Sequence, residues 1–251
     1  MTKRKIKAIL LVAGEGTRLR PYTNDRPKCL VKVDGETLLE SHVNVLKKRG
    51  IDEIVLIGGY KIEMLQTFGL KIIENSRFFE TNMVWTLFCA ANELQGDLII
   101  AYGDIVYSPN ILDSLMESDS DISVTVDLQW ESYWRMRNEN PLDDAETLKL
   151  NPDGAIIELG KKPNSINEIE AQYMGLMKFT AKGINQLKSV YNDLADKENS
   201  YMTDLLQSAI DKGIRVQSVP ISGEWFEVDT VEDLNSDITK SRMNLIMNQC
   251  L

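Results

Sequence analysis

Histidine and cysteine are scarce in this chain, and their scarcity excludes several kinds of catalytic site. The 251 residues include one histidine, His42, and three cysteines, Cys29, Cys89 and Cys250. His42 lies within a helix-like stretch that has no Cys, His or Ser partner in its pattern, so we interpret it as a structural residue and find no support for Ser/His/Asp catalysis. The cysteines are too scattered for a zinc site and too few for a disulfide framework.

Long apolar runs and excess positive charge are also absent. No apolar run approaches the ~20 residues of a membrane span. The basic residues 2–5 precede only a strand-length run, which is unlike a signal peptide, and we therefore expect a cytoplasmic protein with no membrane partner. The formal net charge of −10 argues against a general nucleic-acid binder, which needs a basic face. It leaves room for a nucleotide site, which requires only a few local cations.

The chain has no internal repeat and no low-complexity linker, and its patterns predict one α/β domain. Strand-length apolar runs alternate with helical patterns, which is typical of an open, mostly parallel sheet with ligands at the carboxyl ends of its strands. We expect strands at 8–13, 53–57, 71–74, 97–101, 121–127, 171–179 and 214–219. We expect helices at 36–49, 61–68, 81–93, 108–117, 181–194 and 201–211 and from 231 onward, and a hairpin over 148–159. Residues 129–147 show no clean period and are interpreted as an inserted lid.

The first strand leads into a glycine-rich loop that is suited to a polyphosphate. Gly14-Glu15-Gly16-Thr17 follows the apolar run 8–13, and the cations Arg18 and Arg20 come directly after it. Two glycines let the backbone turn sharply and approach a ligand closely. Backbone amides at a strand's carboxyl end, flanked by fixed positive charge, favour phosphate binding. The Walker pattern and the dinucleotide pattern G-x-G-x-x-G are both absent, since Leu19 occupies the third glycine position of the latter.

The longer string L-V-A-G-E-G-T-R-L-R-P-x-T-x-x-x-P-K-x-L, residues 11–30, resembles the signature of nucleotidyltransferases that join an NTP to a phosphorylated small molecule. The resemblance implies that Arg18 and the amides of residues 14–17 cradle the β- and γ-phosphates. It also implies that Lys28 bridges the α-phosphate and the acceptor phosphate. Lys162, in G-K-K-P, is our candidate for a second clamp on the acceptor phosphate, with an ordinary loop lysine as the alternative. Arg18, Lys28 and Lys162 are therefore the predicted catalytic residues.

Two acids are candidates for holding a metal ion. Asp104 follows Gly103 after a buried strand, and Asp229 ends the segment W-F-E-V-D. The resemblance implies that these acids converge and hold Mg²⁺ on the α-phosphate, with Glu227 as an assisting ligand, and Mg²⁺ prefers such carboxylate oxygens. Read alone, Asp104 and Asp229 would each be interpreted as a helix cap.

Other segments resemble the phosphocholine cytidylyltransferase-like branch, which includes the phosphoglutamine and aminoethylphosphonate cytidylyltransferases of capsule and surface polysaccharide pathways. The segments are 81–87, 130–137, 141–147, 171–179, G-K-K-P and W-F-E-V-D-T-V-E-D-L. The first of them departs from the Q-P-x-G-L-A segment of uridylyl- and thymidylyltransferases. CTP is thus the implied nucleotide, with Asn82 and the backbone near Ala13 and Gly14 reading cytosine. The predicted nucleotide-binding residues are Val12, Ala13, Gly14, Glu15, Gly16, Thr17, Arg18, Asn82, Tyr102 and Gly103.

The acceptor site is less sharply marked. Trp130, Tyr133 and Trp134 lie in sequence near several acids and could form an aromatic and acidic box for a cationic amine. Alternatively, the two tryptophans cover the core from a lid helix. Arg135 or Arg137 could meet an acceptor carboxylate, so phosphocholine, phosphoglutamine and 2-aminoethylphosphonate all remain open. The predicted acceptor-binding residues are Lys28, Trp130, Tyr133, Arg135, Lys162 and Tyr173.

Together these features predict a single Rossmann-like nucleotidyltransferase domain with a mixed, mostly parallel sheet. Residues 1–127 would form the nucleotide-binding half, and 128–251 the acceptor-binding and metal-completing half. We expect Mg²⁺-dependent transfer of CMP from CTP to a small phosphorylated amine or amino acid, with release of pyrophosphate. The alternatives are a sugar-1-phosphate nucleotidyltransferase that uses UTP or dTTP, and a non-catalytic nucleotide-sensing subunit. Met243 and Met247 indicate internal packing or subunit contacts, such as those of a homodimer.

Overall fold

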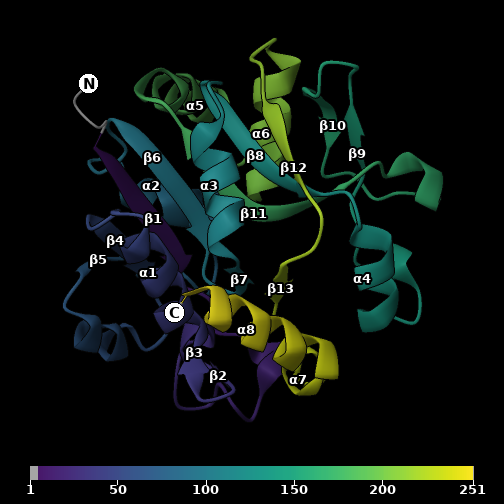
Figure 1. Ribbon diagram of the computed structural model, residues 1–251. Helices are drawn as coiled ribbons and strands as arrows, with labels where there is room; N and C mark the ends of the chain where they lie inside the picture. Colours follow the sequence, from purple (N-terminus) through teal and green to yellow (C-terminus); the bar gives the residue numbers. More distant parts are fainter. Residues whose placement is uncertain (1–4, 251) are drawn as a thin grey trace.

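A central sheet runs through the whole molecule (Figure 1). The computed structural model describes residues 5–250, with the side chain of Cys250 excepted, so most of the basic amino terminus noted above lies outside the described residues. The sheet order is β12-β8-β11-β6-β1-β4-β5, in which β11 alone runs antiparallel to its neighbours. The strands are β1 Ile6–Val12, β4 Ile54–Gly58, β5 Lys71–Glu74, β6 Asp97–Tyr102, β8 Ile122–Asp127, β11 Gln172–Phe179 and β12 Gln217–Ile221. The predicted α/β fold with a mixed, mostly parallel sheet is confirmed.

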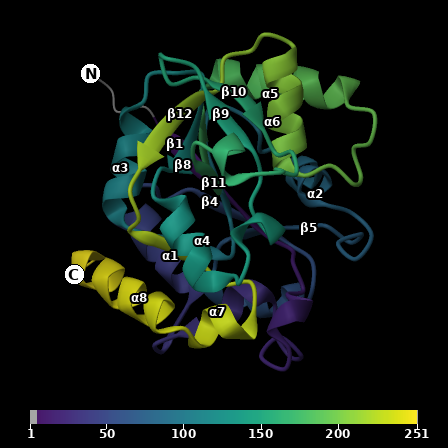
Figure 2. The same ribbon diagram turned by 90° about the vertical axis from the view of Figure 1, so that its right-hand side faces the viewer.

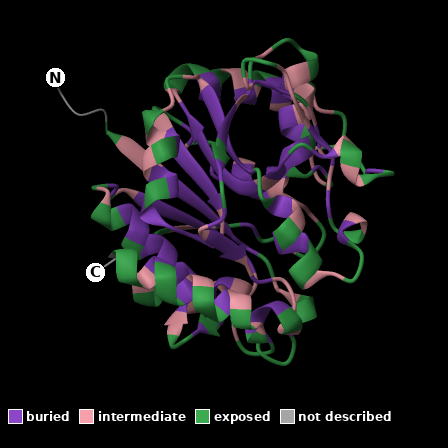
Figure 3. Cartoon of the chain, turned by 45° about the vertical axis from the view of Figure 1, so that its right-hand side comes forward, coloured by how far each residue is buried: buried purple, intermediate pink, exposed green. Residues whose placement is uncertain are grey.

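Helices cover both faces of the sheet, as the two views at right angles show (Figures 1 and 2). Alternate side chains of β1 enter two separate cores: Ala8, Leu10 and Val12 the first, Ile9 and Leu11 the second. This two-sided burial explains the continuous apolar run of β1. The first core is closed by α1 Leu38–Lys48, α3 Pro109–Glu117 and α8 Asp237–Cys250, and the second by α2 Met83–Cys89, α5 Ala181–Asp193 and α6 Met202–Asp211. The sheet accordingly forms the buried centre of Figure 3.

Three two-stranded sheets and several short helices lie outside the central sheet. β7 Ile105–Tyr107 pairs with β13 Trp225–Glu227, β2 Lys32–Val33 with β3 Glu36–Thr37, and β9 Leu148–Leu150 with β10 Ile156–Leu159, which confirms the predicted hairpin. The remaining helices are α4 Trp130–Arg137 and α7 Val231–Asn235. The 3₁₀ turns are η1 Thr17–Leu19, η2 Lys28–Leu30, η3 Ile62–Phe68, η4 Pro141–Asp143 and η5 Ile166–Glu168. Within residues 5–250, no helix combines the length and the apolar character that crossing a bilayer would require.

Several predicted elements differ in type or extent. The helix predicted at 61–68 is the 3₁₀ helix η3, confined between Lys61 and Gly69, which both have left-handed backbones. The helix predicted over 81–93 ends at Cys89, and the Glu93 carbonyl instead accepts a hydrogen bond from Lys7 Nζ at 3.1 Å. The strand predicted at 214–219 is shifted to 217–221 because it pairs in parallel with β8. The last helix is divided where Ser236 adopts an extended backbone.

His42 is a buried histidine on α1, as expected of a structural residue. Its ring lies edge-on to Tyr107, with centroids 4.9 Å apart. Among the residues that the structure describes, neither ring nitrogen has a hydrogen-bond partner. Burial alone lowers the pKa of His42 to about 3. The folded state therefore holds a neutral imidazole in the pH range where the unfolded chain binds a proton.

We expect this histidine to make stability depend on pH. Because its folded-state pKa is depressed, the stability is present above the unfolded-state value of about 6.5 and is lost as the pH falls toward 3. Relative to His42→Leu, the wild type should lose about 2–3 kcal/mol of unfolding free energy between pH 7.5 and pH 4.5. Urea denaturation of both proteins across that range measures the difference. If the free energy of unfolding of wild type and of His42→Leu changed equally with pH, a neutral buried His42 would be contradicted.

Candidate active site

The loop after β1 folds back onto the segment that carries Lys28. Gly16 has φ +68°, and a Cβ at that position would lie 3.0 Å from the Lys28 Cβ, so the close approach requires glycine. Thr23 Oγ1 donates to the Gly16 carbonyl at 2.8 Å, and the Lys28 amide donates to the Gly14 carbonyl at 3.4 Å. Glu15 forms an ion pair with Arg20 on the outside of the loop. The predicted phosphate loop and Lys28 are thus one local unit.

Lys28 joins two carboxylates that are 125 positions apart in the sequence. Its Nζ lies 2.6 Å from Asp104 Oδ2 and 2.5 Å from Asp229 Oδ1, and Arg18 reaches Asp229 Oδ1 at 3.2 Å. Asp104 follows β6, which pairs with β1. Gly103 is needed there because a Cβ would lie 2.6 Å from Val12 Cγ1. Asp229 follows β13, and the amide of Val228 donates to the Asp104 carbonyl at 3.1 Å. The structure therefore brings Arg18, Lys28, Asp104 and Asp229 together.

Charge pairing outweighs burial in setting the pKa values of Lys28 and Asp229. Burial by itself would lower the pKa of Lys28, but the charges of Asp104 and Asp229 outweigh it and hold the pKa above its ordinary value. Burial would raise the pKa of Asp229, and the Lys28 charge outweighs it, so this pKa is lowered. The Lys28 ammonium and the Asp229 carboxylate therefore stabilise each other's charged forms.

A cavity of about 190 Å³ opens between the glycine loop, α2 and the end of β6. It is lined by Leu11, Val12, Ala13, Gly14, Lys28, Cys29, Phe78, Thr81, Asn82, Met83, Thr86, Tyr102, Gly103 and Asp104. The lining contains six of the ten predicted nucleotide-binding residues. Glu15, Gly16, Thr17 and Arg18 are absent from it and lie farther along the loop. Tyr173 lies next to this wall, with its ring edge-on to Tyr102 at 5.7 Å.

Asn82 stands at the amino end of α2 and faces the cavity. Its side-chain oxygen accepts from the Met83 amide at 2.8 Å, and its Nδ2 donates to the Asn199 carbonyl at 3.3 Å. Its own amide donates to the Glu198 carbonyl at 2.7 Å. The loop before α6 thus fixes Asn82 at the cavity wall. Residues 198–199 were not singled out from the sequence. No local pattern indicates that they contact Asn82, which is more than a hundred positions away.

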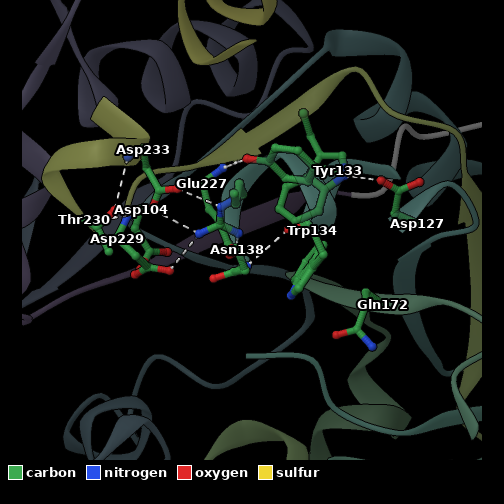
Figure 4. Close-up of polar contacts among 12 residues, drawn as sticks. Asp104, Asp127, Tyr133, Trp134, Asn138, Gln172, Glu227, Asp229, Thr230 and Asp233 are labelled. Carbon is green, nitrogen blue, oxygen red and sulfur yellow. Dashed lines mark hydrogen bonds and ion pairs between the residues drawn. The ribbon is translucent and has the colours of Figure 1, made fainter. Parts of the chain in front are cut away.

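Two of the three predicted metal ligands lie side by side next to the cavity, and the third is paired with an arginine. Oδ1 of Asp104 is buried and has no hydrogen-bond partner among the described residues, so it is an available oxygen ligand beside Asp229. Glu227, the third predicted ligand, lies near Asp104 and Asp229 (Figure 4) and forms an ion pair with Arg137. Within residues 5–250, no group of three or more His, Cys, Asp or Glu side chains is arranged as a metal site. Asp104 and Asp229 fit a hard metal such as Mg²⁺, whose other ligands would come from phosphate and water.

The expected aromatic box is corrected by the structure. Trp130, Tyr133 and Trp134 are each no more than 3% exposed, and they pack against one another and against Trp225. Their rings already face the guanidinium groups of Arg137 and Arg242. A ligand amine has no access to these faces, so Trp130 and Tyr133 do not bind it as a box. The alternative interpretation, a lid helix that covers the core, describes α4.

Two other predicted acceptor residues lie on the surface. Arg135 projects outward and pairs with Glu131 one turn earlier on α4. Lys162 Nζ donates to the carbonyls of Leu142 and Asp143, the latter at 2.8 Å. Lys162 therefore connects its loop to η4. Neither Arg135 nor Lys162 contacts Lys28 in this structure.

Arg137 is the functional candidate to which sequence reasoning gave too little weight. Its side chain is 6% exposed and contacts Glu227, Asp229 and Asp233. The residues Trp130, Tyr133, Trp134 and Arg137 follow the spacing i, i+3, i+4, i+7, which places them on one helical face. That spacing was the available signal, and it indicated that Arg137 points inward with the aromatics.

Comparisons with known proteins show what this chain is similar to in sequence and in fold. Residues 8–136 match the MobA-like NTP transferase domain. The chain is 41% identical to the CTP:phosphoglutamine cytidylyltransferase of Campylobacter jejuni, over 94% of this chain and 100% of that protein. Its fold is similar to the inositol-1-phosphate CTP transferase of T. maritima, with a TM-score of 0.77, 23% identity and 96% of each chain covered. It is also similar to the CTP:phosphocholine cytidylyltransferase of Streptococcus pneumoniae, with a TM-score of 0.71, 20% identity, and 96% of this chain and 99% of that one covered.

Proposed function

Because the chain belongs to the family of MobA-like NTP transferases, we propose that it transfers CMP from CTP to a small phosphorylated amine or amino acid. A phosphate oxygen of the acceptor attacks the α-phosphorus of CTP and forms a new P–O bond. The bond from the α-phosphorus to the bridging oxygen breaks, and pyrophosphate leaves with the electron pair. The acceptor oxygen already carries negative charge, so the protein needs to align the two reactants and balance charge, and no general base is required.

The observation that carries this proposal is the meeting of Lys28, Asp104 and Asp229 at the edge of the cavity. A fixed cation there would neutralise charge on the α-phosphate and on the incoming acceptor phosphate. Arg18 and the amides of residues 14–17 would hold the β- and γ-phosphates. On this account residues 1–127 supply most of the nucleotide contacts, while 128–251 supply Asp229 and the acceptor side. Lys162 would reach the acceptor phosphate only after leaving its two carbonyl partners.

Asp104 and Asp229 would hold Mg²⁺, which is supported by Asp104 Oδ1, an oxygen without a hydrogen-bond partner in the described part of the chain. When bound, the ion would withdraw charge from the phosphate oxygens and so favour attack at phosphorus. The chain's own contribution is to keep the two carboxylates side by side through Lys28 and to place them next to the nucleotide cavity.

CTP as the nucleotide is supported by the cavity wall and by the similar proteins. Asn82 and the backbone of Ala13 and Gly14 line the same cavity, and they offer amide donors and acceptors for the edge of a base. Three proteins to which the chain is similar have names that specify CTP or cytidylyl transfer.

Phosphoglutamine is the acceptor that we propose first, because the similar Campylobacter jejuni enzyme is named for it and aligns along its whole length. Phosphocholine and 2-aminoethylphosphonate are the next candidates, although the burial of Trp130 and Tyr133 removes the aromatic argument for choline. A sugar-1-phosphate transferase would instead require UTP or dTTP. A nucleotide-sensing subunit would have no need for Lys28 and Arg18 to meet Asp104 and Asp229 beside the cavity.

We expect pyrophosphate release when the protein, Mg²⁺ and CTP are combined with phosphoglutamine, and little release with UTP. The assay compares phosphoglutamine, phosphocholine, phosphoethanolamine, 2-aminoethylphosphonate and glucose-1-phosphate under the same conditions. Product analysis by mass should find the CDP-linked acceptor. Activity only with glucose-1-phosphate and UTP or dTTP would contradict the proposal, as would CTP binding without turnover on any acceptor.

A further inference from the structure

Arg137 at the end of α4 contacts three carboxylates that follow β12. Its Nε lies 2.8 Å from Asp233 Oδ1 and its Nη2 lies 3.1 Å from Asp233 Oδ2, which is a bidentate pair. Nη1 bonds Glu227, and Nη2 also reaches Asp229 Oδ2 at 3.4 Å. Figure 4 shows these carboxylates gathered beside Tyr133 and Trp134. One guanidinium therefore connects the lid helix to the whole turn that carries Asp229.

Asp229 is held through both of its oxygens and through its backbone. Oδ1 faces Lys28 and Arg18, whereas Oδ2 faces Arg137. The amide of Asp229 donates at 3.0 Å to Asp233 Oδ2, the oxygen that Arg137 also binds. A rotation of the Asp229 carboxylate would break contacts on both sides. Its orientation is consequently fixed by two residues from the phosphate-loop side, Lys28 and Arg18, and by one from α4.

The position of Arg137 is itself fixed by packing. Its guanidinium lies over the rings of Tyr133 and Trp134, 5.3 Å and 5.5 Å from their centroids. The Tyr133 hydroxyl accepts from the Glu227 amide at 3.1 Å, so the same helix also holds β13. The aromatic face of α4, which binds no ligand in our interpretation, thus has a role in placing Arg137.

We infer that Arg137 is a positioning residue, which orients Asp229 for the metal and for the reacting phosphates. The inference rests on the proposed function, since it assigns Asp229 to that site. Arginine is required because its planar fork can bind Asp233 through two nitrogens while the third nitrogen reaches Glu227. Lysine would keep the charge but could not make these contacts together.

The test compares Arg137→Gln, Arg137→Lys and wild type. Arg49→Gln is the matched control, because Arg49 forms a bidentate pair with Asp113 at 2.7 and 2.8 Å before the amino end of β4, the opposite edge of the sheet. The readouts are kcat per folded molecule, KM for CTP, and the affinity of the protein–CTP complex for Mn²⁺ measured by electron paramagnetic resonance. Removing a residue that orients a metal ligand typically costs about 10–100-fold in metal affinity or activity.

For Arg137→Gln we expect kcat and Mn²⁺ affinity each to fall about 10–100-fold, with KM for CTP changed less than about threefold. Arg137→Lys should recover part of the loss, and Arg49→Gln should behave as wild type. A variant that only melts earlier, with unchanged kcat per folded molecule and unchanged Mn²⁺ affinity, would overturn the inference.

Should Arg137→Gln fail to fold, Arg137→Lys and Asp233→Asn decide by the same readouts. Wild-type values of kcat and Mn²⁺ affinity in both variants would reject the positioning role. A loss of both kcat and Mn²⁺ affinity would support it. If wild type binds Mn²⁺ and CTP but transfers CMP to no acceptor, the proposed function fails. The Mn²⁺ comparison still tests Arg137 in that case.

Discussion

Replacing Lys28 with alanine is expected to lower kcat/KM for CTP by about 10²–10³-fold, whereas Lys162→Ala should cost less than about tenfold. Lys28 Nζ lies within 2.6 Å of carboxylates on two different segments and lines the cavity. Lys162 is held by loop carbonyls and is exposed. A cation that is already fixed at the reacting phosphates contributes more than one that must first be released.

The two variants are compared by steady-state pyrophosphate release with Mg²⁺, CTP and the acceptor that responds best. Circular dichroism establishes that each protein is folded, which matters for Lys28→Ala because it leaves two neighbouring carboxylates without their shared cation. Equal small losses in the two variants would rule out Lys28 as the phosphate clamp. A larger loss for Lys162→Ala would move that role to the lid side.

The strands and the glycine loop could be predicted because their signals are local. β1 is a continuous apolar run since both of its faces are buried, and β5 spans the predicted residues 71–74. Of the two glycines in this loop, Gly16 is the one that the backbone requires, because its conformation is left-handed. Element ends were less accurate, as β12 shows, because strand pairing determines them and pairing is not visible in one segment.

The candidate site could be predicted only where a resemblance supplied the long-range contacts. Spacing alone cannot place Asp104 beside Asp229, because β13 reaches β7 through a chain reversal that no local pattern encodes. The same limit applies to Asn82 and residues 198–199. The aromatic residues of α4 were ambiguous for a different reason: Trp and Tyr serve equally well in a core and in a cation site. Burial decides between the two, and burial depends on the whole fold.

The paired carboxylates lead to the second large effect, which we expect for Asp104→Asn. This substitution should abolish turnover with Mg²⁺ and CTP, a loss of about 10³-fold or more, because it removes an anionic ligand from a two-carboxylate site. The fold should survive. Asp104 Oδ2 bonds Lys28, Oδ1 has no partner within residues 5–250, and asparagine occupies nearly the same volume.

The measurement pairs thermal unfolding with pyrophosphate release for Asp104→Asn and for Asp113→Asn, a control acid on α3 that bonds Arg49. The melting temperature of Asp104→Asn should stay within a few degrees of wild type, which corresponds to a change of about 1 kcal/mol in the free energy of unfolding. Near-normal activity of Asp104→Asn with Mg²⁺ would show that the metal assignment is wrong. In that case Lys28, which the asparagine would leave paired with Asp229 alone, would be the main source of charge neutralisation at the α-phosphate. Comparing the loss of turnover in Lys28→Ala with that in Asp104→Asn therefore shows which group matters more. A larger loss in Lys28→Ala indicates dependence on the ammonium group, and a larger loss in Asp104→Asn indicates dependence on the carboxylate pair.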